Sequence, residues 1–415
     1  MVASPWLRYI FATIGPIAMA ASQFLLTIIM LHAMAPPEFG AFSFLLVGLQ
    51  FSFGISNALF CAPLATLIAE KGAGLREGKI LSLNAANCLF SAAMLVVFGL
   101  MALALSLSQI SALLFGIYAS LASFRWFLRA YAYAVDATYR TISSDIAYSS
   151  CLLPGAFLLN ANSLSAAPLA CFILLGGTLV GLMPFGRPML RDHITSMSIT
   201  NLSRYREVWT QHAKWSLTGV ITTELTVNAH SYIVTLLAGS AAFAGIAASA
   251  LVIRPTMVLL NALSEFERPR MAKHIGQQQR SEAMEMTYSF RLFLMLGWLG
   301  SVVLAVLLFS GAPQLLIPKG YDPSYVKLGA FLWLIVVAIR IARTPESTVL
   351  QASGMFRWLA YCSMISSVFS VVAVLAFFLW GGPVWSIAGV ACGELVMAGW
   401  IWRQMGQLRE GCAHP

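Results

Sequence analysis

The sequence predicts an all-α integral membrane protein with twelve transmembrane helices in two six-helix halves. Three observations lead to this class. The 415 residues are 59% hydrophobic and only 10% charged, whereas about 25% of an ordinary globular chain is charged. Apolar runs long enough to cross a bilayer recur along the whole chain, and basic residues gather in every second segment between them. A mean hydropathy of +0.80 excludes a soluble domain of this length.

A membrane helix needs about 20 mostly apolar residues. The first such run follows Arg8, and it is too long for a signal-peptide core, so we expect it to be retained as the first helix. The twelve runs are, in chain order, 9–32, 40–69, 80–106, 109–132, 143–160, 166–185, 213–238, 241–263, 288–311, 326–350, 357–380 and 384–402.

The basic residues support this number of spans. If both termini are cytoplasmic, all but three of the 25 basic residues fall in or at the edge of cytoplasmic segments. The exceptions are Lys319 and Lys327 outside and Arg254 within the eighth run. Because positive residues stay on the cytoplasmic side, we expect a multi-pass membrane protein with both termini in the cytoplasm. The net charge of +9 then reflects orientation and contact with membrane lipids, and no nucleic acid is expected as a partner.

The longest cytoplasmic segment divides the chain almost equally. We therefore expect an N-terminal bundle over 1–186, a cytoplasmic linker over 187–212 and a C-terminal bundle over 213–415. "PPEFGAFSF" opens the second run and "SAAFAGIAAS" the eighth, while "YRTISSDIAYSS" follows the fourth and "FRWLAYCSMISS" the tenth. Both matches lie six helices apart with the same topology, which indicates parallel repeats related by a pseudo-two-fold axis along the membrane normal.

Motifs of covalent chemistry are absent from the sequence. "GAGLREGKI" has the wrong spacing for a phosphate-binding loop, and the chain has no HExxH and no GxSxG pattern. The seven cysteines form no CxxC pair. We therefore expect neither an enzyme, nor a cofactor, nor a metal site, and a duplicated body of this kind is typical of a transporter.

Two segments resemble a known family. "MAPPEFGAFSFLLVGL" (34–49) resembles the start of the second helix in the polysaccharide-repeat-unit flippases, and "PKGYDPSYVKLGAFLWLIVVAIRIARTPESTVLQASGMFRW" (318–358) resembles their tenth-helix segment. These flippases belong to the superfamily that also holds multidrug exporters and the lipid II flippase. The first run has no Asp or Glu, where the multidrug branch often has an acid for ion coupling.

The resemblance implies two six-helix bundles around a central cavity, which opens alternately to each side of the membrane. The implied substrate is an undecaprenyl-pyrophosphate-linked oligosaccharide, moved across the inner membrane for surface polysaccharide or exopolysaccharide synthesis. Membrane lipids, and polysaccharide polymerase or export machinery, are the implied partners. Proton or sodium coupling would fit the superfamily.

Arg254 is the first candidate site residue. It lies about 20 Å from the predicted outer end of its helix, at 1.5 Å per residue, and Pro255 favours a kink beside it. A charge at this depth is costly unless it has a function or a partner. Arg254 either faces the cavity and binds pyrophosphate or an acidic sugar, or it forms an interhelical ion pair or reaches toward the cytoplasmic face.

The seventh run carries a polar stripe that lines the cavity or packs on another helix. Its members recur at helical spacing and are Glu224, Asn228, Ser231 and Thr235, widened by Thr223, Thr226 and His230. Glu224 is the candidate partner of Arg254 and the candidate for ion coupling. His230 is either a substrate contact or a packing residue.

The first half offers further candidates for the cavity. Gln50 and Asn57 share one face of the second run, and Gln23 and Thr27 share one face of the first. Each pair serves either cavity lining or hydrogen bonding between helices.

Three more charged residues lie in the fourth and twelfth runs. Arg125 and Arg129, at the cytoplasmic end of the fourth run, are either pyrophosphate contacts or orientation signals. Glu394 lies mid-span in the twelfth run, so it has to find a partner or stay neutral.

Two other functions compete with the flippase. One is a proton- or sodium-coupled exporter of drugs or small organic cations, which an acidic cavity would favour over a basic one. The other is a membrane-embedded glycan polymerase or glycosyltransferase, which the short outer loops disfavour.

Overall fold

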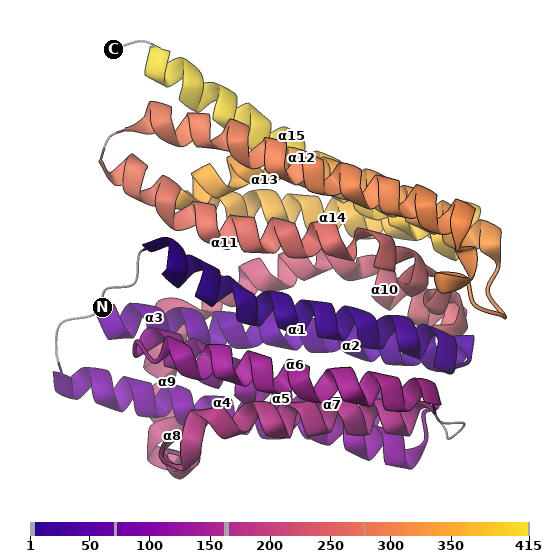
Figure 1. Ribbon diagram of the computed structural model, residues 1–415. Helices are drawn as coiled ribbons and strands as arrows, with labels where there is room; N and C mark the ends of the chain where they lie inside the picture. The colour runs from indigo at the N-terminus through magenta and orange to yellow at the C-terminus, as the bar shows by residue number, and fades with distance from the viewer. Residues whose placement is uncertain (1–4, 70–72, 162–165, 278, 414–415) are drawn as a thin grey trace. The chain divides into compact units, whose positions relative to one another are not determined.

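The computed structural model describes residues 5–69, 73–161, 166–277 and 279–413. Every regular element in these ranges is helical (Figure 1). The chain forms two compact units, residues 1–220 and 221–415, which we call the first and the second unit and describe separately.

In the first unit, long helices pack side by side. α1 packs on α6, α4 on α5, and α7 on both α5 and α6 (Figure 1). Ser108 caps α5 by accepting a hydrogen bond from the Ser111 backbone N–H at 3.2 Å. The elements are α1 (Pro5–Ala33), α2 (Pro36–Ser56), a π-helical turn (Asn57–Cys61), α3 (Ala62–Ala69), α4 (Ala73–Ala104), α5 (Gln109–Ala134), α6 (Thr138–Ala161), α7 (Ala166–Leu182), α8 (Gly186–Thr195) and α9 (Ile199–Val208).

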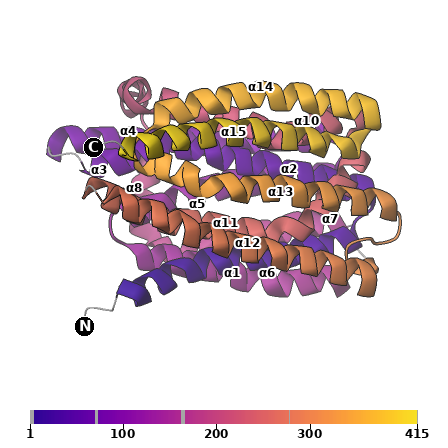
Figure 2. The ribbon, with the colours of Figure 1, turned by 90° about the horizontal axis from the view of Figure 1, so that it is seen from above.

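The second unit is built around α13, which packs against α11, α12 and α15, while α14 packs on α15 (Figure 2). Asp322 caps α13 through the Ser324 backbone N–H at 2.9 Å. The helices are α10 (Lys214–Ser249), whose first residues belong to the first unit, α11 (Arg254–Gly276), α12 (Arg280–Gly311), α13 (Pro323–Ala352), α14 (Phe356–Gly381) and α15 (Ser386–Ala413).

The helices confirm the predicted spans. Among the described residues, eleven helical stretches are long and apolar enough to cross a membrane, and ten of them match single predicted runs. The eleventh, Ser216–Ile275, covers the seventh and eighth runs together. Gly239 breaks it with φ 82° and ψ 170°, at the turn expected between those two runs. A positive φ is readily adopted only by glycine. The protein is therefore a multi-pass membrane protein with twelve spans.

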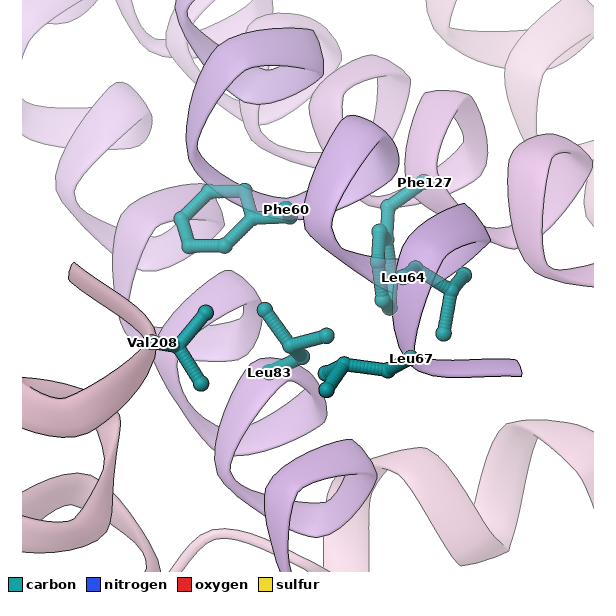
Figure 3. Packing of buried hydrophobic residues seen from close by; sticks show 6 residues of the cluster. All are labelled: Phe60, Leu64, Leu67, Leu83, Phe127 and Val208. Atoms are coloured by element: carbon teal, nitrogen blue, oxygen red, sulfur yellow. The ribbon is translucent and has the colours of Figure 1, made fainter. Parts of the chain in front are cut away.

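The segment predicted as a linker, 187–212, contains α8 and α9, which pack on α4. Figure 3 shows Val208 of α9 meeting Leu83, Phe60 and Leu67 in one buried cluster. The Tyr205 hydroxyl donates to the Leu59 carbonyl at 3.0 Å. Burial raises the pKa of Tyr205, so its hydroxyl stays a donor. Both helices are polar and only ten residues long, so a search for membrane-length apolar runs does not detect them.

Close packing of α14 on α15 yields a test with a matched control. A Cβ at Gly389 would lie 2.3 Å from the Val374 backbone, whereas a Cβ at Gly399 of the same helix meets nothing within 4 Å. We expect Gly389→Ala to lower the melting temperature of the purified protein by several degrees, because backbone must move. Gly399→Ala should leave it unchanged or slightly raised, since alanine favours helix. Equal melting temperatures for the two variants would contradict this packing.

Candidate functional site

Arg254 stands where a long helix changes direction. α10 ends at Ser249, residues Ala250–Ile253 form a 3-10 turn, and α11 begins at Arg254 with Pro255 in its first turn. The regular α-helix is thus interrupted beside the proline, as the sequence predicts. The Arg254 side chain is half-buried. The N-terminus of α11 adds a partial positive charge to that of the guanidinium.

Thr256, two residues on, fixes this part of α11. Its Oγ1 lies 2.6 Å from Oγ of Ser301 and donates to the Gly297 carbonyl at 3.0 Å, both on α12. The start of α11 is therefore held to α12, and Arg254 projects from an anchored turn.

Glu224 is bound by neutral donors of its own helix. Its Oε1 accepts from the Tyr232 hydroxyl at 2.6 Å, and its Oε2 accepts from Asn228 Nδ2 at 3.1 Å. Glu224 and Asn228 are half-buried. Pairing of Glu224 with Arg254 stays a prediction.

Residues within the polar stripe, and Thr222 beside it, contact different neighbours. Thr222 accepts from Ser363 at 3.0 Å, and the Thr226 carbonyl accepts from Ser370 at 2.7 Å, so this side of α10 packs on α14. His230 is buried edge-on against Trp333, with 5.0 Å between ring centroids, and its Nε2 is 3.1 Å from Ser231 Oγ. Part of the stripe therefore serves helix packing.

The polar residues of the first two spans fall into two groups, those bonded between helices and those that are exposed. The Gln23 side chain forms a hydrogen bond between helices, since its Nε2 donates to the Tyr148 hydroxyl of α6 at 3.2 Å. Gln50 and Asn57 are exposed, on α2 and on the π-helical turn that follows it. Trp126 of α5 donates its indole N–H to Asn57 Oδ1 at 2.9 Å.

Arg125 and Arg129 share one carboxylate. Arg125 Nη2 lies 2.6 Å from Asp145 Oδ1, and Arg129 Nη2 lies 2.8 Å from Oδ2. Asp145 of α6 is fully buried, and the two arginine side chains are 7% and 10% exposed. Arg125 also donates through Nε to Ser144 at 2.9 Å. α1 approaches α6 closely beside this cluster: a Cβ at Gly15 would lie 3.1 Å from the Asp145 side chain.

The second unit contains a comparable cluster that the sequence analysis missed. Arg340 of α13 donates through Nε and Nη2 to Glu394 Oε1 at 2.9 and 2.6 Å. Arg343 Nε donates to Oε2 at 2.7 Å. Glu394 of α15 is fully buried, so the expectation that it finds a partner or stays neutral is met by ion pairing.

The assignment of Arg340 and Arg343 to a cytoplasmic loop edge needs correction, because both side chains are only 12% exposed and lie within α13. The sequence did contain a signal for this cluster, namely two arginines three residues apart on one helix and a lone mid-span glutamate on another. Arg291 of α12 and Glu346 of α13 form a further ion pair.

The two clusters place their arginine pairs on corresponding helices. The arginine pair lies on α5, the fourth span of its unit, and on α13, also the fourth. The carboxylate comes from the fifth span in the first unit and from the sixth in the second. Each cluster holds two guanidinium groups and one carboxylate. Each therefore carries a net positive charge.

Within the described ranges, no group of three or more His, Cys, Asp or Glu side chains could hold a metal ion. The cysteines whose side chains are described are free thiols.

Solved structures share this arrangement of helices. The fold is that of the MATE and MurJ transporters. An inward-facing multidrug resistance MATE family transporter of the MOP superfamily has a TM-score of 0.67 and 13% identity, covering 98% of this chain and 100% of its own. The lipid II flippase MurJ in an inward closed conformation has a TM-score of 0.69 and 11% identity, covering 96% and 87%. The eukaryotic MATE transporter AtDTX14 has a TM-score of 0.63 and 17% identity, covering 96% of both.

The sequence matches no family model, and no curated protein matches it. At sequence identities this low, the similarity to the solved structures shows the fold alone.

The Asp145 cluster yields an asymmetric prediction. Asp145→Asn leaves two buried cations without a counter-charge, which costs about 3–5 kcal/mol. Arg129→Gln leaves one arginine with one carboxylate and should cost clearly less. We expect folded yield and melting temperature in detergent to fall far more for Asp145→Asn.

Asp136→Asn is the matched control, since Asp136 is exposed at the α5–α6 turn with φ 58°, which asparagine also tolerates. It should behave like the unmodified protein. Equal losses from Asp145→Asn and Arg129→Gln would show that charge balance is not what holds these helices.

Proposed function

We propose that this protein is a flippase that moves an undecaprenyl-pyrophosphate-linked oligosaccharide across the bacterial inner membrane by alternating access. It would supply surface polysaccharide or exopolysaccharide synthesis. The fold supports a transport role, because the solved structures that share it include the lipid II flippase MurJ and MATE transporters. The proteins with this fold are transporters or flippases, and we propose likewise that this protein is not an enzyme.

Arg254 is the single observation that carries the proposal. It is a half-buried guanidinium within a membrane-spanning stretch, at an interrupted helix whose N-terminus reinforces its charge. A guanidinium presents a planar fork of donors that matches phosphate oxygens. An anion that crosses a low-dielectric region needs such a partner, because its desolvation otherwise costs several kcal/mol or more.

The sign of the buried charge also favours an anionic substrate. Both arginine clusters carry two cations for one carboxylate. Their positive excess would repel a cationic drug and attract a pyrophosphate. In this mechanism Arg254 binds the headgroup, the lipid tail stays in the bilayer, and rocking of two rigid units exposes the site on the other side.

The other candidates take supporting roles in this proposal. Asn228, Gln50 and Asn57 would contact the substrate, whereas His230, buried against Trp333, would serve helix packing. Arg125 and Arg129 would contribute their excess charge while Asp145 holds them in place. We place the protein in the inner membrane with both termini in the cytoplasm.

Glu224 is the proposed ion-coupling residue. Its hydrogen-bond partners, Tyr232 and Asn228, are neutral, whereas Asp145 and Glu394 each bind two arginines. A carboxylate held by neutral donors can take up a proton without breaking an ion pair. Proton coupling through Glu224 is therefore the form of energy coupling that we propose.

A coupled exporter of drugs or small organic cations is the alternative function. The likeness to MATE transporters favours it, and Glu224 would then be the cation-binding group.

Arg254→Ala should abolish surface polysaccharide in the host while the protein remains in the membrane. Loss of a charge-assisted contact lowers substrate affinity about ten- to hundredfold. Arg254→Lys should restore part of the activity, because lysine keeps the charge but lacks the fork. Arg268→Ala, at an exposed position of the same helix, is the control. Normal surface polysaccharide with Arg254→Ala would refute the proposal.

Glu224→Gln tests the coupling. Glutamine keeps the carbonyl that accepts from Tyr232 and removes the titratable proton. The rate at which a fluorescent glycolipid is flipped is measured in proteoliposomes with and without a pH gradient. We expect the gradient to change this rate for the unmodified protein and to leave it unchanged for Glu224→Gln. Arg268→Ala, at an exposed position of α11, should retain the response. A gradient response that survives in Glu224→Gln would exclude Glu224 as the proton carrier.

A further inference from the structure

One face of α2 combines exposed amides with aromatic rings. Gln50 and Asn57 are both exposed and are seven residues apart, so they share a face and lie about 10 Å apart along the axis. Both fall within the membrane-spanning stretch Pro36–Leu64. Exposed amides in a span face water or a polar partner, since contact with lipid would leave their hydrogen bonds unmade.

Between these amides lies a stacked aromatic pair. Phe53 is one turn from both amides on the same face, and its ring lies parallel to Trp126 of α5, with an interplanar angle of 2° and centroids 4.7 Å apart. Both residues are half-buried. The Trp126 indole N–H donates to Asn57 Oδ1 at 2.9 Å, which joins the aromatic pair to the amide.

The arrangement is rigid because ion pairs support it. The Arg129 guanidinium lies over the Trp126 ring, 5.1 Å from its centroid. Arg129 is itself bound to buried Asp145 at 2.8 Å. Trp126 is therefore held by Phe53, Asn57 and Arg129 together, and little reorganisation would be needed to receive a ligand.

We propose that Gln50, Phe53, Asn57 and Trp126 form a carbohydrate-binding platform, which receives the sugar portion of the transported glycolipid. This inference rests on the proposed function and adds to it the part of the first unit that recognises the glycan. Phe53 and the Arg129 guanidinium cover the faces of the Trp126 ring, so the apolar C–H face of a pyranose would pack on Phe53, which Trp126 holds in place. The hydroxyls around the rim of the pyranose would bond to the amides.

The polar groups of the platform fit hydroxyls better than ions. Asn57 Oδ1 is engaged by Trp126, so Asn57 presents its amide N–H donors, while Gln50 offers both a donor and an acceptor. The four side chains are neutral, and the nearby Arg129 disfavours a cationic ligand. The separation of the amides along the helix is comparable to the length of a disaccharide.

The test compares two lipids that differ only in the sugar. Binding of undecaprenyl pyrophosphate and of undecaprenyl-pyrophosphoryl-N-acetylglucosamine to the full-length protein is measured in lipid nanodiscs. We expect the unmodified protein to bind the sugar-bearing lipid more tightly. Gln50→Ala and Asn57→Ala should each weaken binding of the sugar-bearing lipid about five- to tenfold and leave binding of undecaprenyl pyrophosphate unchanged.

Gln23→Ala is the matched control, because Gln23 is an amide of the same unit that bonds to Tyr148 instead. It should retain the preference for the sugar. Equal binding of both lipids by the unmodified protein, or a preference that persists in both platform variants, would overturn the platform. If the platform variants bind both lipids equally less well and also have a lower melting temperature, these residues have a structural role, and the platform is overturned. If the unmodified protein binds neither lipid, the proposed function itself fails.

Discussion

Two buried arginine–carboxylate clusters are the interactions on which each half of this molecule depends. A charge inside a membrane-embedded bundle is tolerated only when a partner offsets its desolvation. Asp145 meets this requirement for Arg125 and Arg129, and Glu394 meets it for Arg340 and Arg343. The helices that carry these groups are thereby fixed relative to one another. Close approach of α7 is part of the same constraint, because a Cβ at Gly181 would lie 2.7 Å from Arg125 Nε.

This constraint divides the intramembrane polar residues into two sets. The clusters and the Thr226–Ser370 contact hold helices together. Arg254, Glu224 and Gln50 are half-buried or exposed, and in the proposed function they contact the substrate or an ion. The proposed transport cycle needs both sets: one to keep each half intact, and one whose partners change during the cycle.

The two halves satisfy the same constraint in different ways. Both place an arginine pair on the fourth span, yet the carboxylate comes from the fifth span in one half and from the sixth in the other. In the repeated segments "YRTISSDIAYSS" and "FRWLAYCSMISS", Asp145 of the first aligns with Cys362 of the second. The duplicated architecture thus preserves a charge balance while the residues that provide it differ.

The sequence by itself determined the twelve spans, their grouping into two halves and the unusual position of Arg254, because hydropathy and charge alternation are local properties of the chain. It also showed that Glu394 needs a partner. Only the tertiary structure decided which partner, since Arg340 and Glu394 are 54 residues apart and their pairing depends on how α13 packs against α15. The same holds for Phe53 and Trp126, whose stacking joins two helices that no sequence period connects. Polar residues that share a helical face can be found from spacing alone, but the neighbour that each face meets is set by packing.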